Sequence, residues 1–323
     1  MSAIFSPEVL VFDEQAEIER LCTWIRNVVG KQLGRRGAVV GLSGGIDSSV
    51  VGALCVKALG PKRVFGLLLP EHDSSSETTP LGRQLVEHLG IDHREESISA
   101  ILEGANGYHR RDESIRQTLP EYGEGWKNKI VLPPATDGTY RIFQLVAQDP
   151  SGKEYRERMN SDSYLGVVAA TNFKQRSRTM LQYYWADRLV YAVAGTPNRL
   201  EFDQGFFVKG GDGLADFKPI VHLYKTQVYA LAKALELPAE IQGRSPTTDT
   251  YSLPQSQDEF YYSLPWKRMD LALWAYDHQI SAAEAAPVLE LDPEQVEHVY
   301  RDIESKRKVA SYLHAAPVTP TTK

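Results

Sequence analysis

The sequence predicts an α/β fold, in which a parallel sheet is covered by helices on both faces. In the N-terminal third, short apolar runs alternate with segments whose apolar residues recur at helical spacing, in the order strand, helix, strand, helix, strand. Each connecting helix returns the chain to the end of the sheet where the previous strand began, so the strands run parallel to one another. Such folds bind ligands at the carboxyl ends of their strands, and a polar, glycine-rich turn follows the first apolar run at that position.

Each element has its own signal. Ile18, Leu21 and Ile25 recur at intervals of three and four residues, which is typical of an amphipathic helix packed on a core. The helix after the glycine-rich turn ends at Gly60-Pro61, as helices commonly do. The expected elements are helix 18–33, strand 37–42, helix 48–59, strand 63–69, helix 76–89, strand 93–98, helix 161–186 and strand 189–194.

The alternation lapses between about 101 and 158, where Gly, Pro, Tyr and charged residues are frequent. Within this excursion the turn Asp149-Pro-Ser-Gly152 separates the runs 139–148 and 153–158. Pro at the second position and Gly at the fourth are typical of a type I turn, so we expect a β-hairpin here. Loops of this length tend to be lids or disordered, and the sequence leaves both open.

We expect a single domain over residues 1–310, with the excursion inserted in it. The last residues, 311–323, are rich in Pro and Thr and are expected to form a frayed tail.

The composition argues against several classes of function. Lys and Arg total 36 against 42 Asp and Glu, so the formal net charge is −6, which argues against a nucleic acid or an anionic membrane as partner. The two cysteines, Cys22 and Cys55, fall within expected helices, so neither a disulfide framework nor a zinc site is expected. No apolar run approaches the ~20 residues of a membrane helix, and we expect the cytoplasm.

The turn between strand 37–42 and the next helix is predicted to hold phosphate groups. Gly44 and Gly45 lack a β-carbon, so the chain can bend tightly and bring backbone N–H groups close to an anion. Ser43 and Ser48 add hydroxyl donors, and the following helix directs its unsatisfied N–H groups at the same place. An ordinary strand-to-helix turn is the alternative interpretation.

Asp47 lies in this turn, where a phosphate would repel its carboxylate. Its presence suggests a shared Mg²⁺, because that ion takes one or two carboxylates together with phosphate oxygens. The pattern Ser-Gly-Gly-x-Asp-Ser is neither Walker A nor the dinucleotide Gly-x-Gly-x-x-Gly. It resembles the loop of the N-type ATP pyrophosphatases, which split ATP between its α and β phosphates.

A second series of residues follows in the C-terminal half. It contains Asn172, Arg176, Arg178, Gly195, Thr196, Glu201, Lys209, Gly211, Asp212, Gly213, Asp216, Pro219, Lys225, Pro246 and Thr247. Together with the first loop, this series resembles NAD synthetase, the enzyme that amidates nicotinic acid adenine dinucleotide. The resemblance covers about 37–98 and 160–310 and implies a Rossmann-like sheet of the adenine nucleotide alpha hydrolase-like type.

The resemblance also implies roles for individual residues. Those matched to ATP contacts are Gly41, Leu42, Ser43, Gly44, Gly45, Ile46, Asp47, Ser48, Thr196, Lys225 and Thr247; those matched to the dinucleotide substrate are Arg176, Lys209, Asp216 and Lys306. Asp47 and Glu201 match the carboxylates that hold magnesium. Ser305 stands where the family has a histidine, which puts one substrate contact in doubt. Taken singly, Lys225 and Glu201 fit a solvated surface equally well.

The expected chemistry explains these residue types. A carboxylate reacts poorly with ammonia, so it must first become an acyl adenylate, with pyrophosphate leaving. Backbone donors, Lys225 and Mg²⁺ would stabilise the charge that builds on the departing phosphates. Ammonia arrives mostly as ammonium, and either Asp212 or Asp216 could accept its proton.

The nitrogen source is expected to be free ammonia. A glutamine-dependent enzyme needs a nucleophilic cysteine, whereas Cys22 and Cys55 look like packing residues. A separate glutaminase chain that docks is the alternative source of nitrogen. The ammonia-dependent relatives form homodimers, so the resemblance implies a homodimer, and the N-terminal helix is one interface element to consider.

Other functions remain open at this stage. The nearest is a paralogue that amidates a different carboxylate substrate, with Ser305 and the excursion reshaping the acceptor pocket. A tRNA-modifying member of the superfamily would favour a basic surface, which the net charge of −6 does not provide. A nucleotide-sensing protein without activity is the third alternative; the presence together of Asp47, Glu201, Lys209, Lys225 and Thr247 argues against it.

Overall fold

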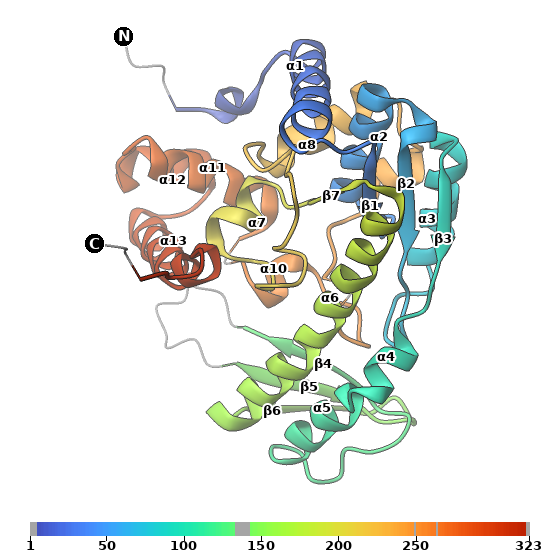
Figure 1. Ribbon diagram of the computed structural model, residues 1–323. Coiled ribbons are helices and arrows are strands. Elements are labelled where there is room, and N and C mark those ends of the chain that lie inside the picture. Colours follow the sequence, from blue (N-terminus) through green and yellow to red (C-terminus); the bar gives the residue numbers. More distant parts are fainter. Residues whose placement is uncertain (1–4, 133–142, 249, 263, 321–323) are drawn as a thin grey trace.

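The computed structural model describes residues 5–132, 143–248, 250–262 and 264–320. Its main sheet is parallel and has the order β3-β2-β1-β7. The strands are β1 (Ala38–Gly41), β2 (Val64–Leu68), β3 (Asp92–Glu95) and β7 (Ala192–Ala194). The first strand is thus central, with β2 and β7 on either side of it (Figure 1). The predicted α/β class and its parallel sheet are confirmed.

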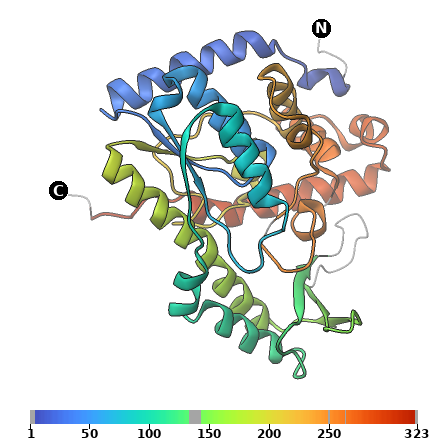
Figure 2. The same ribbon diagram turned by 90° about the vertical axis from the view of Figure 1, so that its right-hand side faces the viewer.

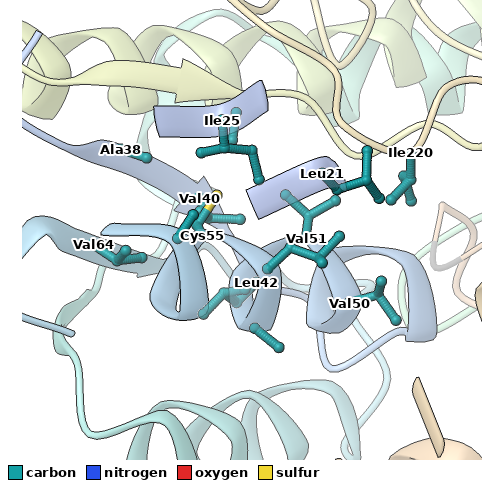
Figure 3. Close-up of a cluster of buried hydrophobic side chains, with 14 of the residues drawn as sticks. Leu21, Ile25, Ala38, Val40, Leu42, Val50, Val51, Cys55, Val64 and Ile220 are labelled. Atoms are coloured by element: carbon teal, nitrogen blue, oxygen red, sulfur yellow. The ribbon is translucent and has the colours of Figure 1, made fainter. Parts of the chain in front are cut away.

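Helices cover both faces of this sheet. On one face α1 (Glu14–Arg26), α2 (Ile46–Leu59), α3 (Thr78–Leu89) and α8 (Lys225–Ala234) enclose the largest apolar cluster. Leu21 and Ile25 of α1 point toward α2 in Figure 3, so the apolar stripe of the N-terminal helix is used for core packing. On the other face α4 (Ser99–Gly104) and α6 (Ser161–Leu189) pack on Val39 and Val193.

Two boundaries differ from the sequence prediction for physical reasons. The third strand, expected at 93–98, is Asp92–Glu95, and all four of its side chains are exposed. It lies at the edge of the sheet, where charged side chains discourage pairing with another chain. Helix α6 continues to Leu189 and ends at Val190, which adopts a left-handed φ of 58°, so the strand expected at 189–194 begins only at Ala192.

The excursion is ordered over the part that the structure describes. It contributes α4, α5 (Gly107–Arg116) and a second, antiparallel sheet of order β4-β5-β6. Its strands are β4 (Lys127–Val131), β5 (Gln144–Gln148) and β6 (Glu154–Arg158). This sheet lies at the lower end of the molecule in Figures 1 and 2, where α6 connects it to the main sheet.

The predicted hairpin is confirmed as β5 and β6. Its turn closes with a hydrogen bond from the Asp149 N–H to the Lys153 carbonyl at 3.0 Å. Gly152 has a φ of 89°, which only glycine adopts readily. The first expected strand began at residue 139, and residues 139–142 lie outside the described part of the chain.

The C-terminal part forms a helical layer beside the sheet (Figure 1). It consists of α7 (Arg199–Gln204), α11 (Trp266–Asp277), α12 (Ala282–Leu289) and α13 (Pro293–His314), with the short helix α10 (Gln257–Phe260) nearby. The short helix α9 (Ala239–Gln242) instead packs against α2 and α8. Short 3₁₀ segments occur at Pro7–Leu10 and Pro61–Arg63, and α1 continues into a π-helical turn at Asn27–Gln32. Helix α13 continues through His314, so the first four residues of the expected tail at 311–323 are helical.

None of the helices in the described ranges is both long and apolar enough to cross a membrane.

Candidate active site

A cavity of about 530 Å³ opens at the carboxyl ends of β1 and β2. The predicted nucleotide residues that line it are Gly41, Leu42, Ser43, Gly45, Ile46, Asp47, Ser48, Thr196, Lys225 and Thr247, and Glu201 and Asp212 line it as well. Residues from both halves of the chain therefore come together at the carboxyl ends of the strands, as expected for a parallel sheet.

Gly44 shapes the loop rather than the cavity wall. Its φ of 68° is left-handed, and a β-carbon there would lie 2.6 Å from the β-carbon of Leu81 on α3. The loop thus lies directly on α3, and a larger residue would push it away.

Hydrogen bonds of its own serines fix the conformation of the loop. Ser48 donates from Oγ to the Gly45 carbonyl at 3.1 Å and accepts the Ser43 N–H at 3.3 Å. Gly45 is the N-cap of α2 and has no side chain with which to cap the helix. The first N–H groups of α2 therefore remain without a side-chain cap, which suits an anion.

Three charged side chains from three elements meet at the cavity. Lys225 of α8 is 2% exposed; its Nζ forms an ion pair with Oδ2 of Asp47 on α2 and lies 3.7 Å from Oε1 of Glu201 on α7. Gln257 of α10 donates to the same Glu201 oxygen at 3.0 Å. Two carboxylates thus share one buried ammonium group, and all three side chains line the cavity.

Burial and the charge of Asp47 raise the pKa of Glu201 to about 7. Burial disfavours the charged form of Lys225, but the carboxylates of Asp47 and Glu201 outweigh it, so the pKa of Lys225 is raised. Lys225 therefore stays protonated, while Glu201 is poised to exchange its proton for another cation near neutral pH.

Asp270 of α11 fixes the start of the helix that carries Lys225. It is fully buried and accepts the N–H of Lys225 at 3.2 Å and the N–H of Thr226 at 2.7 Å. A carboxylate at a helix N-terminus stabilises the unpaired N–H groups there. Burial nevertheless raises the pKa of Asp270 to about 6.

The excursion forms part of the cavity wall. Phe143 of the excursion and Tyr164 of α6 both line the cavity, and their rings stack with centroids 4.0 Å apart. From the C-terminal half, Tyr251 and Phe260 line the same wall and belong to the apolar cluster beneath the small sheet.

Strand β4 supports the segment 250–260, which carries these residues and Gln257. The Leu253 N–H donates to the Asn128 carbonyl at 3.1 Å, and Lys129 donates from Nζ to Glu259 at 2.7 Å and to the Pro254 carbonyl at 3.2 Å. The described part of the excursion is therefore built into the cavity wall and is more than a surface decoration.

The residues matched to the dinucleotide substrate lie outside the cavity lining. On the surface near the end of α13, the exposed Arg176 donates to the Lys209 carbonyl at 3.3 Å, and Lys209 donates to the Tyr312 carbonyl at 2.7 Å. Ser305 is exposed on α13, whereas Lys306 is buried and donates to the Tyr261 carbonyl at 2.6 Å. Their substrate roles stay predictions.

The structure separates the two candidate proton acceptors. Asp212 lines the cavity, and burial raises its pKa to about 6. Asp216 is exposed and accepts the N–H of Val193 at 2.8 Å and the hydroxyl of Tyr183 at 3.3 Å, so it anchors β7 to α6.

Several residues of the site had no assigned role from the sequence. Arg178 and Arg244 line the cavity from α6 and from the segment after α9; Arg178 donates to the Leu69 carbonyl at 3.0 Å. Asn198 and Asp270 contact Asp47 and Lys225. For Asn198 a signal existed, because Asn198-Arg-Leu-Glu201 is a capping-box pattern.

Fold and loop together define an α/β protein with an ATP pyrophosphatase type of phosphate loop. The profile of the NAD synthase family matches residues 17–119 and 143–310. The chain is 52% identical over 311 residues to an NH(3)-dependent NAD(+) synthetase of Mesorhizobium japonicum, which covers 96% of this chain and 98% of that protein. The chain belongs to the NAD synthase family and is an enzyme of the ligase class.

Solved structures of other proteins share the fold, among them the following two. An NMN synthetase of Francisella tularensis has a TM-score of 0.67 at 22% identity, covering 97% of this chain and 100% of that one. An NH3-dependent NAD synthetase of Campylobacter jejuni has a TM-score of 0.62 at 23% identity, covering 96% and 100%.

We predict that Lys129→Met loosens the segment 250–260. Loss of a partly exposed ion pair costs about 1 kcal/mol or less, so amide hydrogen exchange over 252–259 should rise by up to about fivefold while β1 keeps its protection. Lys127→Met is the matched control, because Lys127 is exposed on the same strand. Equal exchange in the two variants would contradict the support role of Lys129.

Proposed function

We propose that this enzyme makes NAD by ATP-dependent amidation of nicotinic acid adenine dinucleotide, with ammonia as the nitrogen donor and AMP and pyrophosphate as the other products. The observation that carries the proposal is that the phosphate loop, which includes Asp47, lines one cavity together with Lys225 and Glu201. The relative that is 52% identical over nearly its whole length supports this choice of reaction.

The residues present fit a magnesium ion that binds together with phosphates. Asp47 and Glu201 both line the cavity, and the raised pKa of Glu201 reflects burial and the repulsion between the two carboxylates, which a divalent cation would relieve. The described residues contain no group of three or more His, Cys, Asp or Glu side chains that could hold a metal ion. Phosphate oxygens of the nucleotide would therefore have to complete the coordination by Asp47 and Glu201. Mg²⁺ commonly takes one or two carboxylates and completes its shell with phosphates and water.

The chain's own groups would act on the two bonds that change. The substrate carboxylate attacks the α-phosphorus of ATP, and the bond to the β-phosphate oxygen breaks. Lys225 and the N–H groups at the start of α2, which has no side-chain cap, would stabilise the charge that develops on the leaving pyrophosphate. Bound Mg²⁺ would neutralise further phosphate charge.

The second step needs free ammonia at the acyl carbon, where AMP leaves with the carboxyl oxygen. We assign the acceptor of the ammonium proton to Asp212, because it lines the cavity and its pKa of about 6 suits proton exchange near neutral pH. Asp216 is committed to holding β7 and α6 together.

Free ammonia as donor agrees with the two cysteines. Cys22 and Cys55 are buried in the core beneath α1 and α2, and burial raises the pKa of both thiols. A nucleophilic cysteine needs the thiolate form, which this environment disfavours. A docking glutaminase and the cytoplasmic location stay predictions.

We propose a homodimer that uses the surface near the end of α13. The apolar stripe of α1 is buried in the core, and Trp24 is the exposed large apolar residue on that helix. Met180, Tyr184, Leu214 and Tyr312 are exposed apolar residues, and Val309 is exposed where it lines the cavity. Tyr312 accepts a hydrogen bond from Lys209 through its carbonyl, and Met180 lies one turn after Arg176 on α6.

A paralogue that amidates a different carboxylate is the alternative. The likeness to an NMN synthetase is at 22% identity and speaks for the fold alone. Ser305, which raised this alternative, is exposed on α13 and does not line the cavity.

Incubation with ATP, Mg²⁺, ammonium and nicotinic acid adenine dinucleotide should yield NAD, AMP and pyrophosphate. Asp47→Asn should leave folding intact and slow AMP release by at least about 10²-fold, because loss of one stabilising group typically costs that much. ADP and orthophosphate as products would refute the proposed reaction, and near-normal activity of Asp47→Asn would refute the role of that carboxylate.

We predict that metal affinity falls at low pH. A cation at Glu201 must displace the proton that is bound below the pKa of about 7, so apparent Mg²⁺ affinity should fall by up to about tenfold per pH unit below 7 and level off above it. Protonation of ATP itself also changes metal binding with pH. This contribution is the same in Glu201→Gln, which therefore serves as the control. Identical pH profiles of the two proteins would exclude Glu201 as a ligand.

A further inference from the structure

Asn198 lies between the two proposed metal carboxylates. It precedes α7 as its N-cap, and its side chain is almost fully buried, with a relative exposure of 1%. The residue directly follows Thr196-Pro197, which line the cavity. The mechanism outlined above assigns Asn198 no part.

The amide oxygen of Asn198 holds Glu201. Its Oδ1 accepts the Glu201 N–H at 3.1 Å, while Oε2 of Glu201 accepts the Asn198 N–H at 3.3 Å. This reciprocal pair is a capping box, in which the N-cap and the third helical residue satisfy each other's backbone. It fixes one carboxylate oxygen of Glu201 and leaves Oε1 facing Lys225 and Gln257.

The amide nitrogen of Asn198 holds Asp47, which lies 151 residues earlier in the sequence. Nδ2 donates to Oδ1 of Asp47 at 2.9 Å, and Oδ2 of Asp47 pairs with Lys225. The two ends of one amide are thus used by two different helices. Because only its NH₂ group donates and only its oxygen accepts, a single orientation of the amide satisfies both contacts.

We propose that Asn198 is a positioning residue that sets the spacing and orientation of Asp47 and Glu201 for the metal. The inference rests on the proposed metal role of these two carboxylates. A neutral amide can orient a carboxylate without cancelling its charge, so Asp47 keeps its attraction for a cation. Groups that orient metal ligands in this way commonly matter tenfold or more for metal affinity.

The substitution Asn198→Ser separates the two contacts. Serine is as good an N-cap as asparagine and can still accept the Glu201 N–H, but it lacks the amide that donates to Asp47. Asn160→Ser is the matched control, because Asn160 caps α6 by accepting the Ser163 N–H at 2.8 Å. Asn198→Thr provides a second capping residue without the amide.

The test is Mn²⁺ binding, measured by electron paramagnetic resonance in the presence of α,β-methylene-ATP, with thermal unfolding recorded in parallel. We expect about tenfold weaker binding in Asn198→Ser and Asn198→Thr and unchanged binding in Asn160→Ser. A lowered melting temperature with unchanged Mn²⁺ affinity would reduce Asn198 to a helix cap and overturn the proposal.

A double-mutant cycle identifies the path of the effect. If Asn198 acts through Asp47, adding Asn198→Ser to Asp47→Asn should weaken Mn²⁺ binding little beyond the single change. Fully additive losses would overturn the proposal. If Mn²⁺ binding weakens in Asp47→Asn but not in Asn198→Ser, the positioning role of Asn198 is rejected and the metal site is retained. If Mn²⁺ binding is unchanged in both variants, the metal site itself is rejected.

Discussion

The buried ion cluster of Lys225, Asp47 and Glu201 is the interaction on which the site depends. A single ammonium group lies between two carboxylates, and each of the three side chains comes from the first turn of a different helix. Burying a charge without a partner is costly, so removal of Lys225 would leave both carboxylates uncompensated, whereas removal of one carboxylate leaves Lys225 with the other. The cluster therefore ties α2, α7 and α8 together at the place where the phosphates are expected.

Neutral groups around this cluster determine its geometry. Asn198 and Gln257 donate to the carboxylates, and Asp270 holds the start of α8 from behind. Gln257 belongs to a segment that strand β4 of the excursion supports. The long insertion thus connects to the charged centre through one wall of the cavity, although it lies far from the phosphate loop in the sequence.

The sequence allowed a good part of this to be predicted. The glycine-rich turn and the alternation of apolar runs are local signals, and the carboxyl-end rule for parallel sheets predicted that the turn with Asp47 and the residue Thr196 lie at the ligand end of the sheet. Glu201, Lys225 and Thr247 were assigned from the family resemblance. Helix α5 and strand β4 were missed. Within α5 the buried residues include Arg111 and Ser114, so its apolar pattern is weak, and the contacts of β4 with 250–260 bridge more than 100 residues. The contact of Asn198 with Asp47 is equally non-local and could not be read from spacing.

The most direct measurement of the central claim is a crystal structure of the enzyme with Mn²⁺ and α,β-methylene-ATP, using the anomalous signal of manganese to locate the metal. The account predicts the triphosphate on the loop Gly41–Ser48 and the manganese peak beside Asp47 and Glu201, with Lys225 next to the phosphates. A nucleotide bound elsewhere, or a manganese ion that neither carboxylate contacts, would contradict it.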